Sequence, residues 1–129
     1  MGFLDKIKEF FKKFKEENKG FATTMKRINS PGYCGNINRG VRNGDFWEGS
    51  YVSLENGKGV IYGSNQPDYY FSGEDVQSFD VDENKKCEVS VGDKKLVGLR
   101  CTIIFKDGKS AQADIIVAML GKFRTALNI

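Results

Sequence analysis

The sequence predicts an α+β domain that is mainly β, with antiparallel strands in meander order between two helices. Three observations support this fold class. Residues 3–17 place their large apolar side chains at helical spacing. From residue 46 to residue 115, short apolar runs alternate with turn signals such as Asn56-Gly57 and Asp107-Gly108. After residue 115 the apolar spacing becomes helical again.

The bulk properties predict a small folded protein. A chain of 129 residues usually forms one folded domain, and we divide it into a helix over residues 1–20 and a β domain over residues 21–129. The hydrophobic content of 40% and charged content of 29% are ordinary for such a protein. Three cysteines at spacings that match no zinc or redox motif indicate reduced thiols. No secretory signal or membrane-spanning run is evident, so we expect a cytoplasmic location.

Charge is distributed unevenly along the chain. The net charge of +3 is too small to indicate a nucleic-acid partner. Residues 45–85 contain nine acidic residues against two lysines, a balance of −7, which leaves +10 for the rest. This predicts a charge dipole, although solvated strands of one sign would give the same count. We expect no nucleic-acid binding, even through the cations Lys26, Arg27, Arg39 and Arg42.

The N-terminal segment predicts an amphipathic helix that ends near Gly20, a natural C-terminal stop. Its large apolar side chains fall within an arc of about 120°. These side chains, which we call the Phe stripe, are Phe3, Leu4, Ile7, Phe10, Phe11 and Phe14. Lysines border the Phe stripe on both edges, and acidic residues occupy the centre of the polar face. The bordering lysines that we assign to docking are Lys6, Lys8, Lys12, Lys13 and Lys15.

Three roles fit the Phe stripe. It could cover a sheet face of its own domain, with the lysines as snorkelling cover. It could enter a groove of a protein partner or pair with a second copy. It could lie in a membrane interface, with phenylalanine rings at the acyl boundary and lysines among anionic head groups. The net charge of the segment is only about +2, so electrostatic attraction to lipid would be modest.

The region after the helix is harder to assign from its pattern. Residues 22–28 fit either a first strand or a continuation of the helix. Residues 29–45 contain Pro31 and several glycines, which predicts a loop or two short irregular strands. Clearer strands follow, and each is bounded by turn residues. We expect strands at residues 46–54, 59–63, 68–71, 76–81, 87–91, 96–98, 99–105 and 110–115. The closing helix is expected at about residues 116–128.

Three segments resemble a known family. Residues 49–63 look like a characteristic hairpin of bacterial PH-like (pleckstrin-homology-like) domains. Residues 73–79 are similar to the short link before a central strand of that family, and residues 102–109 to its last hairpin. The resemblance covers residues 22–128 and implies a meander curled into a small barrel with a helix plugging one end. PH-like folds bind lipids, peptides and proteins, and the phosphoinositide-binding cluster has no counterpart here, so we carry over no ligand residue.

The residue types limit the chemistry. Histidine is absent, which removes histidine-based acid–base and nucleophilic catalysis and most zinc sites. Cys34 is expected in a glycine-rich loop near Arg39 and Arg42, where an unreactive thiol is favoured over an activated one. The acidic run at residues 80–83 lacks the pattern of a calcium loop, so we predict solvated charges. We predict no metal and no cofactor.

These observations predict a non-enzymatic binding or adaptor domain, docked to a protein partner or a membrane surface through its amphipathic helix. Self-association through the helix is a further possibility. The alternative is a small-ligand barrel, or an unusual enzyme with tyrosine, lysine or carboxylate groups in a pocket. A polar pocket containing Tyr51, Tyr62 or Tyr69 would favour the alternative, and an interior filled by aromatic rings would argue against it. Trp47 and Cys101 are expected to be buried in the core.

Overall fold

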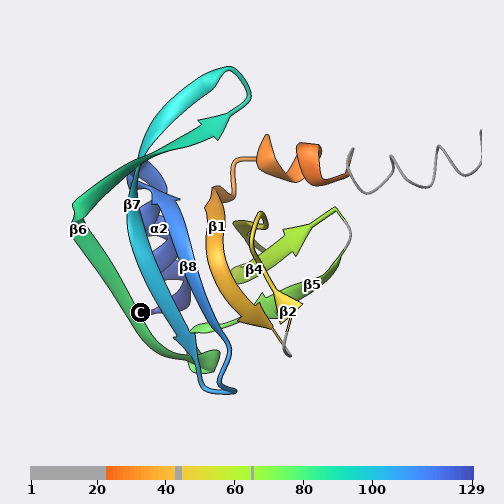
Figure 1. The fold of residues 1–129 in the computed structure, drawn as a ribbon, viewed down its shortest axis with the longest axis vertical. Helices are drawn as coiled ribbons and strands as arrows, with labels where there is room; N and C mark the ends of the chain where they lie inside the picture. The colour runs from red at the N-terminus through yellow and green to blue at the C-terminus, as the bar shows by residue number, and fades with distance from the viewer. Residues whose placement is uncertain (1–22, 43–44, 65) are drawn as a thin grey trace, which may run out of the picture.

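The structure is a computed structural model that describes residues 23–42, 45–64 and 66–129. The helix predicted for residues 1–20 lies outside these residues. The described chain is mainly β, with a short helical segment at residues 23–28 and a C-terminal helix (Figure 1). The strands are β1 Tyr33–Arg42, β2 Asp45–Phe46, β3 Tyr51–Glu55, β4 Lys58–Gly63, β5 Gln66–Phe71, β6 Val76–Val91, β7 Lys94–Phe105 and β8 Ser110–Ile116. A 3-10 turn, η1, spans Gly73–Asp75, and helix α2 spans Val117–Leu127.

The strands form one antiparallel sheet in the order β5-β4-β3-β1-β8-β7-β6, and β2 pairs with β1. The sheet therefore contains two meanders, β3 to β5 and β6 to β8, as the hairpin signals predicted. Strand β1 lies between the meanders and pairs with β3 on one side and β8 on the other. The predicted loop or irregular strands at residues 29–45 are thus corrected, because most of this segment is the central strand.

Close backbone packing explains why a glycine-rich segment forms this central strand. A side chain at Gly35 would place its Cβ 1.8 Å from the carbonyl oxygen of Asp114 on β8. At Gly40 the Cβ would lie 2.9 Å from the carbonyl oxygen of Ser110. The register of β1 also shifts between Ile37 and Arg39, which marks an irregularity in the ladder. The glycines are therefore the residues that let β1 approach its neighbour.

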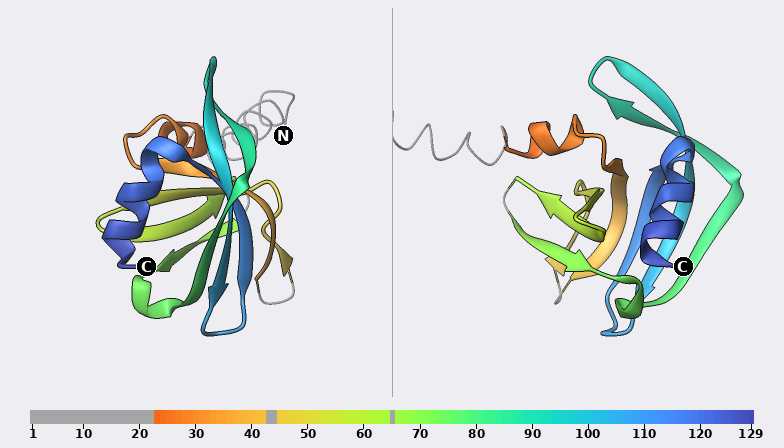
Figure 2. Two further views of the ribbon diagram at one scale, coloured as in Figure 1. Left: turned by 90° about the vertical axis from the view of Figure 1, so that its left-hand side faces the viewer. Right: turned by 180° about the vertical axis from the view of Figure 1, so that it is seen from behind.

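The sheet is not closed into a barrel, which corrects that part of the prediction. In the described part of the chain, β5 and β6 stand at opposite ends of the strand order and each pairs with one neighbour. Ser72 turns the chain between them, and both its amide and its hydroxyl donate to the carboxylate of Asp75. Helix α2 packs against β1, β4, β7, β8 and η1 and so occupies the opening (Figure 2). A seven-strand antiparallel sheet with a C-terminal helix is compatible with a PH-like fold.

The hairpin predicted at Asn56-Gly57 is confirmed in detail. Both residues have positive φ, 54° and 76°, and Glu55 pairs with Lys58 across the turn. This conformation matches the twist of the two flanking strands, and it is the one that an Asn-Gly pair adopts most readily. The turn at Asp107-Gly108 is confirmed as well, with the Asp107 carboxylate accepting a hydrogen bond from the Lys109 amide.

Strands β6 and β7 are longer than predicted. The predicted strands at 76–81 and 87–91 are parts of β6, joined through a bulge between Asp82 and Lys86. Asp82 pairs with Arg100 and Lys86 with Leu99, so three residues of β6 have no counterpart on β7. The charged residues and Asn84 at the bulge suggested a loop between two strands. Instead, β6 pairs with β7 on both sides of the bulge.

The core lies between the inner face of the sheet and α2. The strand predicted at residues 99–105 is confirmed within β7, where the alternate residues Cys101, Ile103 and Phe105 are fully buried. Trp47 is buried as predicted and packs its ring against Tyr69 and Phe105. Helix α2 contributes residues of the face that its spacing predicted. Its core side chains are Met119, Leu120, Phe123 and Leu127.

We expect Gly35→Ala to lower the free energy of unfolding by about 1–3 kcal/mol, because the new methyl group would overlap the Asp114 carbonyl in the middle of the sheet. Gly121→Ala is the matched control. A Cβ at Gly121 in α2 would meet no atom within 4 Å, and alanine favours the helix, so this variant should gain about 0.5–1 kcal/mol. Urea unfolding measures both, and equal stability of the two variants would contradict the packing of β1.

Candidate docking surface

The predicted docking residues, the Phe stripe and its lysines, lie outside the described residues. The structure instead describes how the chain that follows them is held. Residues 23–28 are helical, which excludes the first strand that was one of the two alternatives for this segment. Arg27 and Ile28 attach this helical segment to the sheet, on the face of β3 and β4 that is turned away from the main core.

Arg27 makes the most extensive polar contacts of this attachment. Its Nε and Nη2 donate to the two carboxylate oxygens of Glu55 at 2.8 and 3.0 Å. Its Nη1 donates to both oxygens of Asp68 at 2.9 and 3.0 Å. The guanidinium carbon lies 3.9 Å from the ring centre of Tyr62. We call this set, Arg27 with Glu55, Asp68 and Tyr62, the Arg27 clamp. It joins the helical segment to β3, β4 and β5.

The surroundings of Arg27 in the clamp favour the charged form of its guanidinium group. Burial opposes the positive charge of Arg27, but the hydrogen bonds to Glu55 and Asp68 outweigh it and raise the pKa of the guanidinium above its ordinary value. Burial also raises the pKa of Tyr62 to about 12. The Tyr62 hydroxyl is 2.6 Å from the Ser53 hydroxyl, which gives this buried polar group a partner. Arg27 therefore stays charged across the ordinary pH range.

A small second cluster of apolar residues completes the attachment. Ile28 at the end of the helical segment packs with Tyr33 of β1, Val89 of β6 and Ile116 of β8, all buried. Tyr51, Val91 and Met119 pack around this cluster. The second cluster therefore links the helical segment to both meanders and to the first turn of α2.

Val89 belongs to a projecting hairpin that we call the arm, residues 86–97. Strand β8 pairs with β7 from Gly98 to Ile104, so the arm extends past the end of β8 as a two-stranded ribbon (Figure 1). The arm lies at the same end of the molecule as residues 23–28. Two of its apolar side chains are exposed, Leu96 at 37% and Val97 at 56%. The sequence predicted the strands of this hairpin at residues 87–91 and 96–98, but not that the hairpin extends past the end of β8.

The interior of the described domain is filled by aromatic rings. Phe71, Phe105 and Phe123 are fully buried and in edge contact with each other or with Tyr69 and Trp47. This is the arrangement that we expected to argue against a ligand pocket inside the sheet. Of the three tyrosines named for such a pocket, Tyr62 is fully buried in the Arg27 clamp and Tyr69 packs in the core. Tyr51 lines a shallow hollow beside Asn36 and Asn38 on the outer face.

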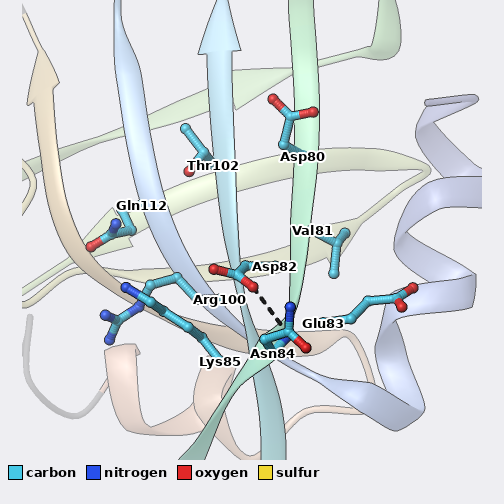
Figure 3. A pocket seen from close by; sticks show the side chains of 9 residues that line it. All are labelled: Asp80, Val81, Asp82, Glu83, Asn84, Lys85, Arg100, Thr102 and Gln112. Atoms are coloured by element: carbon cyan, nitrogen blue, oxygen red, sulfur yellow. Dashed lines mark hydrogen bonds between the residues drawn. The ribbon is translucent and has the colours of Figure 1, made fainter.

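A hollow of about 510 Å³ lies on the outer face at the β6 bulge (Figure 3). Its lining carries charges of both signs, from Asp80, Asp82, Glu83, Lys85 and Arg100. Arg100 donates to the buried carboxylate of Asp114 at 3.3 Å, and Asp82 accepts a hydrogen bond from the Asn84 amide. The acidic residues are exposed, as predicted for solvated charges. Among the described residues, no group of three histidine, cysteine or acidic side chains is placed to hold a metal ion.

Cys101 is buried as predicted, whereas the position predicted for Cys34 is corrected. Cys34 lies in β1 and not in a flexible loop, and it is fully buried like Cys101. Burial raises the pKa of the Cys34 and Cys101 thiols to about 12 in each case. Cys87, on the arm, has its pKa raised to about 11, chiefly by burial and then by the nearby Asp114 carboxylate. All three thiols are therefore protonated and weakly nucleophilic at neutral pH.

The comparisons with known proteins add no relative. No family model, no curated protein and no solved structure matches this chain. Within the described ranges, no helix is both long and apolar enough to cross a bilayer.

We expect Arg27→Met to lower the free energy of unfolding by about 1–3 kcal/mol, because it leaves the Glu55 and Asp68 carboxylates close together without their shared cation. Arg27→Lys should recover only part of this loss, since an ammonium group cannot replace the two forked contacts. The control is Arg39→Met at an exposed site, with a change within about 0.5 kcal/mol. Thermal unfolding measures all three, and a loss in Arg39→Met equal to that in Arg27→Met would contradict the clamp.

We expect the free energy of unfolding to fall as pH rises above about 9. The Cys34 thiol loses its proton near pH 9.0 when unfolded but only near about 12 when folded. The folded state therefore binds more protons in this window, and each such group lowers the stability by up to about 1.4 kcal/mol per pH unit. Urea unfolding at several pH values should give a shallower slope for Cys34→Ala than for the parent. Parallel slopes would show that Cys34 titrates normally in the folded protein.

Proposed function

We propose that the chain is a non-enzymatic binding or adaptor domain that docks to a hydrophobic surface, of a membrane or a protein partner, through the Phe stripe. The observation that carries the proposal is the placement of six large apolar side chains on one side of residues 3–14, with lysines along both borders. Removing the apolar face of such a helix from water lowers the free energy and so favours docking.

The attachment of residues 23–28 supports this proposal. A docking segment can hold its domain close to a surface only if the chain that follows the segment is anchored on the domain. The Arg27 clamp and the second cluster hold that chain on the outer face of β3 and β4 through ionic and apolar contacts. Residues 23–28, which come after the Phe stripe in the sequence, are therefore anchored on the domain.

The distribution of exposed apolar side chains also supports docking outside the domain. If the Phe stripe covered its own domain, a matching apolar patch would be needed on one face. The large apolar side chains exposed on the described surface are spread over the helical segment, three strands and α2. They are Met25, Val41, Tyr70, Leu96, Val97, Ile104 and Val117.

The proposal includes a PH-like identity for the β domain, in a cytoplasmic protein of bacterial type that is peripheral on a membrane when docked there. The open antiparallel sheet and the C-terminal helix that packs across its opening support this assignment. Folds of this class present loops and hairpins at their rim for recognition, while the core serves stability.

The proposal is tested on the full chain by replacing three rings of the Phe stripe, Phe10→Ser, Phe11→Ser and Phe14→Ser, together. Each ring is worth about 1.5–3 kcal/mol when buried, so binding should fall more than about tenfold per ring. Vesicle co-sedimentation reads out a membrane surface, and light-scattering mass reads out self-association or a protein partner. Glu9→Gln with Glu16→Gln on the polar face is the control and should retain docking. If deletion of residues 1–20 changes neither readout, the docking role is wrong.

A further inference from the structure

The outer face of β6, β7, β8 and β1 carries three rows of side chains that run across the strands. Residues that pair directly in an antiparallel sheet point to the same face, so the pairing register defines each row. Figure 1 shows β6 to β8 from this side, with α2 behind them on the opposite face. From β6 to β1, the outer-face rows are Asp82-Arg100-Asp114-Asn36, Asp80-Thr102-Gln112-Arg39 and Ser78-Ile104-Ser110-Val41.

The charges of the first row and of the β6 bulge cancel. Arg100 on β7 donates to the buried carboxylate of Asp114 on β8. Asp82 on β6 stands next to Arg100 in the row, and Lys85 from the bulge extends alongside Arg100 (Figure 3). The two cations and the two acidic residues together have no net charge. This part of the face therefore gives little net attraction or repulsion towards another charged surface.

Asp80 and Arg39 are the remaining charges of the outer-face rows, and they stand at opposite ends of the middle row. Three strand spacings separate them, or about 14 Å. Both side chains are exposed, and among the residues that the structure describes neither forms an ion pair. Glu83 points away from Gln112 and the rest of the middle row (Figure 3). The middle row is therefore acidic at its β6 end and cationic at its β1 end.

We propose that the outer-face rows bind the same rows of a second copy of the chain, in a two-fold symmetric dimer. A two-fold axis that runs parallel to the strands, between β7 and β8, reverses each row in the partner. Asp80 then lies opposite Arg39 of the partner subunit, and Arg39 lies opposite the partner's Asp80. Thr102 lies opposite the partner's Gln112, where a hydroxyl and an amide have matching donors and acceptors. Each contact therefore occurs twice, as in other isologous interfaces.

Two features favour a second copy over a different protein. Identical surfaces usually repel each other because they carry the same charge, but the outer-face rows with Lys85 sum to zero and place opposite charges at opposite ends. Ile104, which is 38% exposed, lies beside the proposed axis. Its side chain would meet the same residue of the partner subunit and leave water. The face is only four strands wide, so we expect a weak dimer.

This interface uses no residue of the Phe stripe and is independent of the proposed function. The experiment is sedimentation velocity of the full chain at concentrations up to about 1 mM, where a dimer with a Kd of about 0.1 mM is populated. We expect Asp80→Arg and Arg39→Asp each to weaken dimerisation about tenfold or more, because two like-charge contacts replace two ion pairs. An equal mixture of these two variants should dimerise like the parent, since each supplies the charge that the other needs.

The matched controls are Asp93→Arg on the arm and Lys122→Asp on α2, which make the same changes of charge at exposed sites outside the outer-face rows. Both should dimerise like the parent, and so should the Phe-stripe variant. Thermal unfolding should show that every variant folds.

The outcomes separate this interface from the proposed function. A parent that stays monomeric at every concentration, as expected if a different protein covers the face, overturns the dimer. A dimer that the Phe-stripe variant abolishes and Asp80→Arg leaves intact also overturns it, and the proposed function then stands. If the controls weaken the dimer as much as Asp80→Arg does, net charge explains the effect and the interface is wrong. If the mixture of Asp80→Arg and Arg39→Asp stays monomeric, the opposed placement of the two residues is wrong.

Discussion

The double pairing of β1 is the constraint on which the rest of the structure depends. Strands β3 to β5 and β6 to β8 each form a hairpin-connected meander, but β1 is the strand that hydrogen-bonds to both. The close approach at Gly35 sets how near β8 comes, and the continuous sheet then brings Trp47, Phe71 and Phe105 together under α2. Without this pairing the two meanders would have separate apolar faces and no shared core.

The two faces of the sheet have different tasks. The inner face holds aromatic rings and α2, which accounts for the stability of the fold. The outer face of β3 to β5 is covered by residues 23–28, and the outer face of β6 to β8 is polar, with the buried Asp114 carboxylate paired to Arg100. The hydrogen bond from Arg100 gives this buried carboxylate a polar partner.

Local chemistry in the sequence predicts much of this fold. Asn56-Gly57 and Asp107-Gly108 locate two hairpins because their conformations are set by the turn residues themselves, and the helical face ending in Phe123 and Leu127 follows from its spacing. Strand β1 could not be predicted, because its glycines act through the Asp114 and Ser110 carbonyls of a strand distant in sequence. The barrel closure expected from the PH-like resemblance was wrong for a related reason: whether end strands meet depends on how α2 fills the opening. For the candidate site, Arg27 was visible only as one cation among several, since Glu55 and Asp68 come close to it only after folding.

The open sheet leaves two end strands at which copies of the protein could associate. Two end strands, β5 and β6, present backbone groups that could recruit strands from other molecules. Strand β5 contains Pro67, which lacks an amide donor, and Asp68, whose charge is drawn towards Arg27. Strand β6 carries Asp80, Asp82, Glu83 and Lys85 around a bulge that interrupts its ladder. Proline, charge and bulges are features by which β proteins resist amyloid-like association. The two end strands therefore carry their own protection against pairing with other molecules.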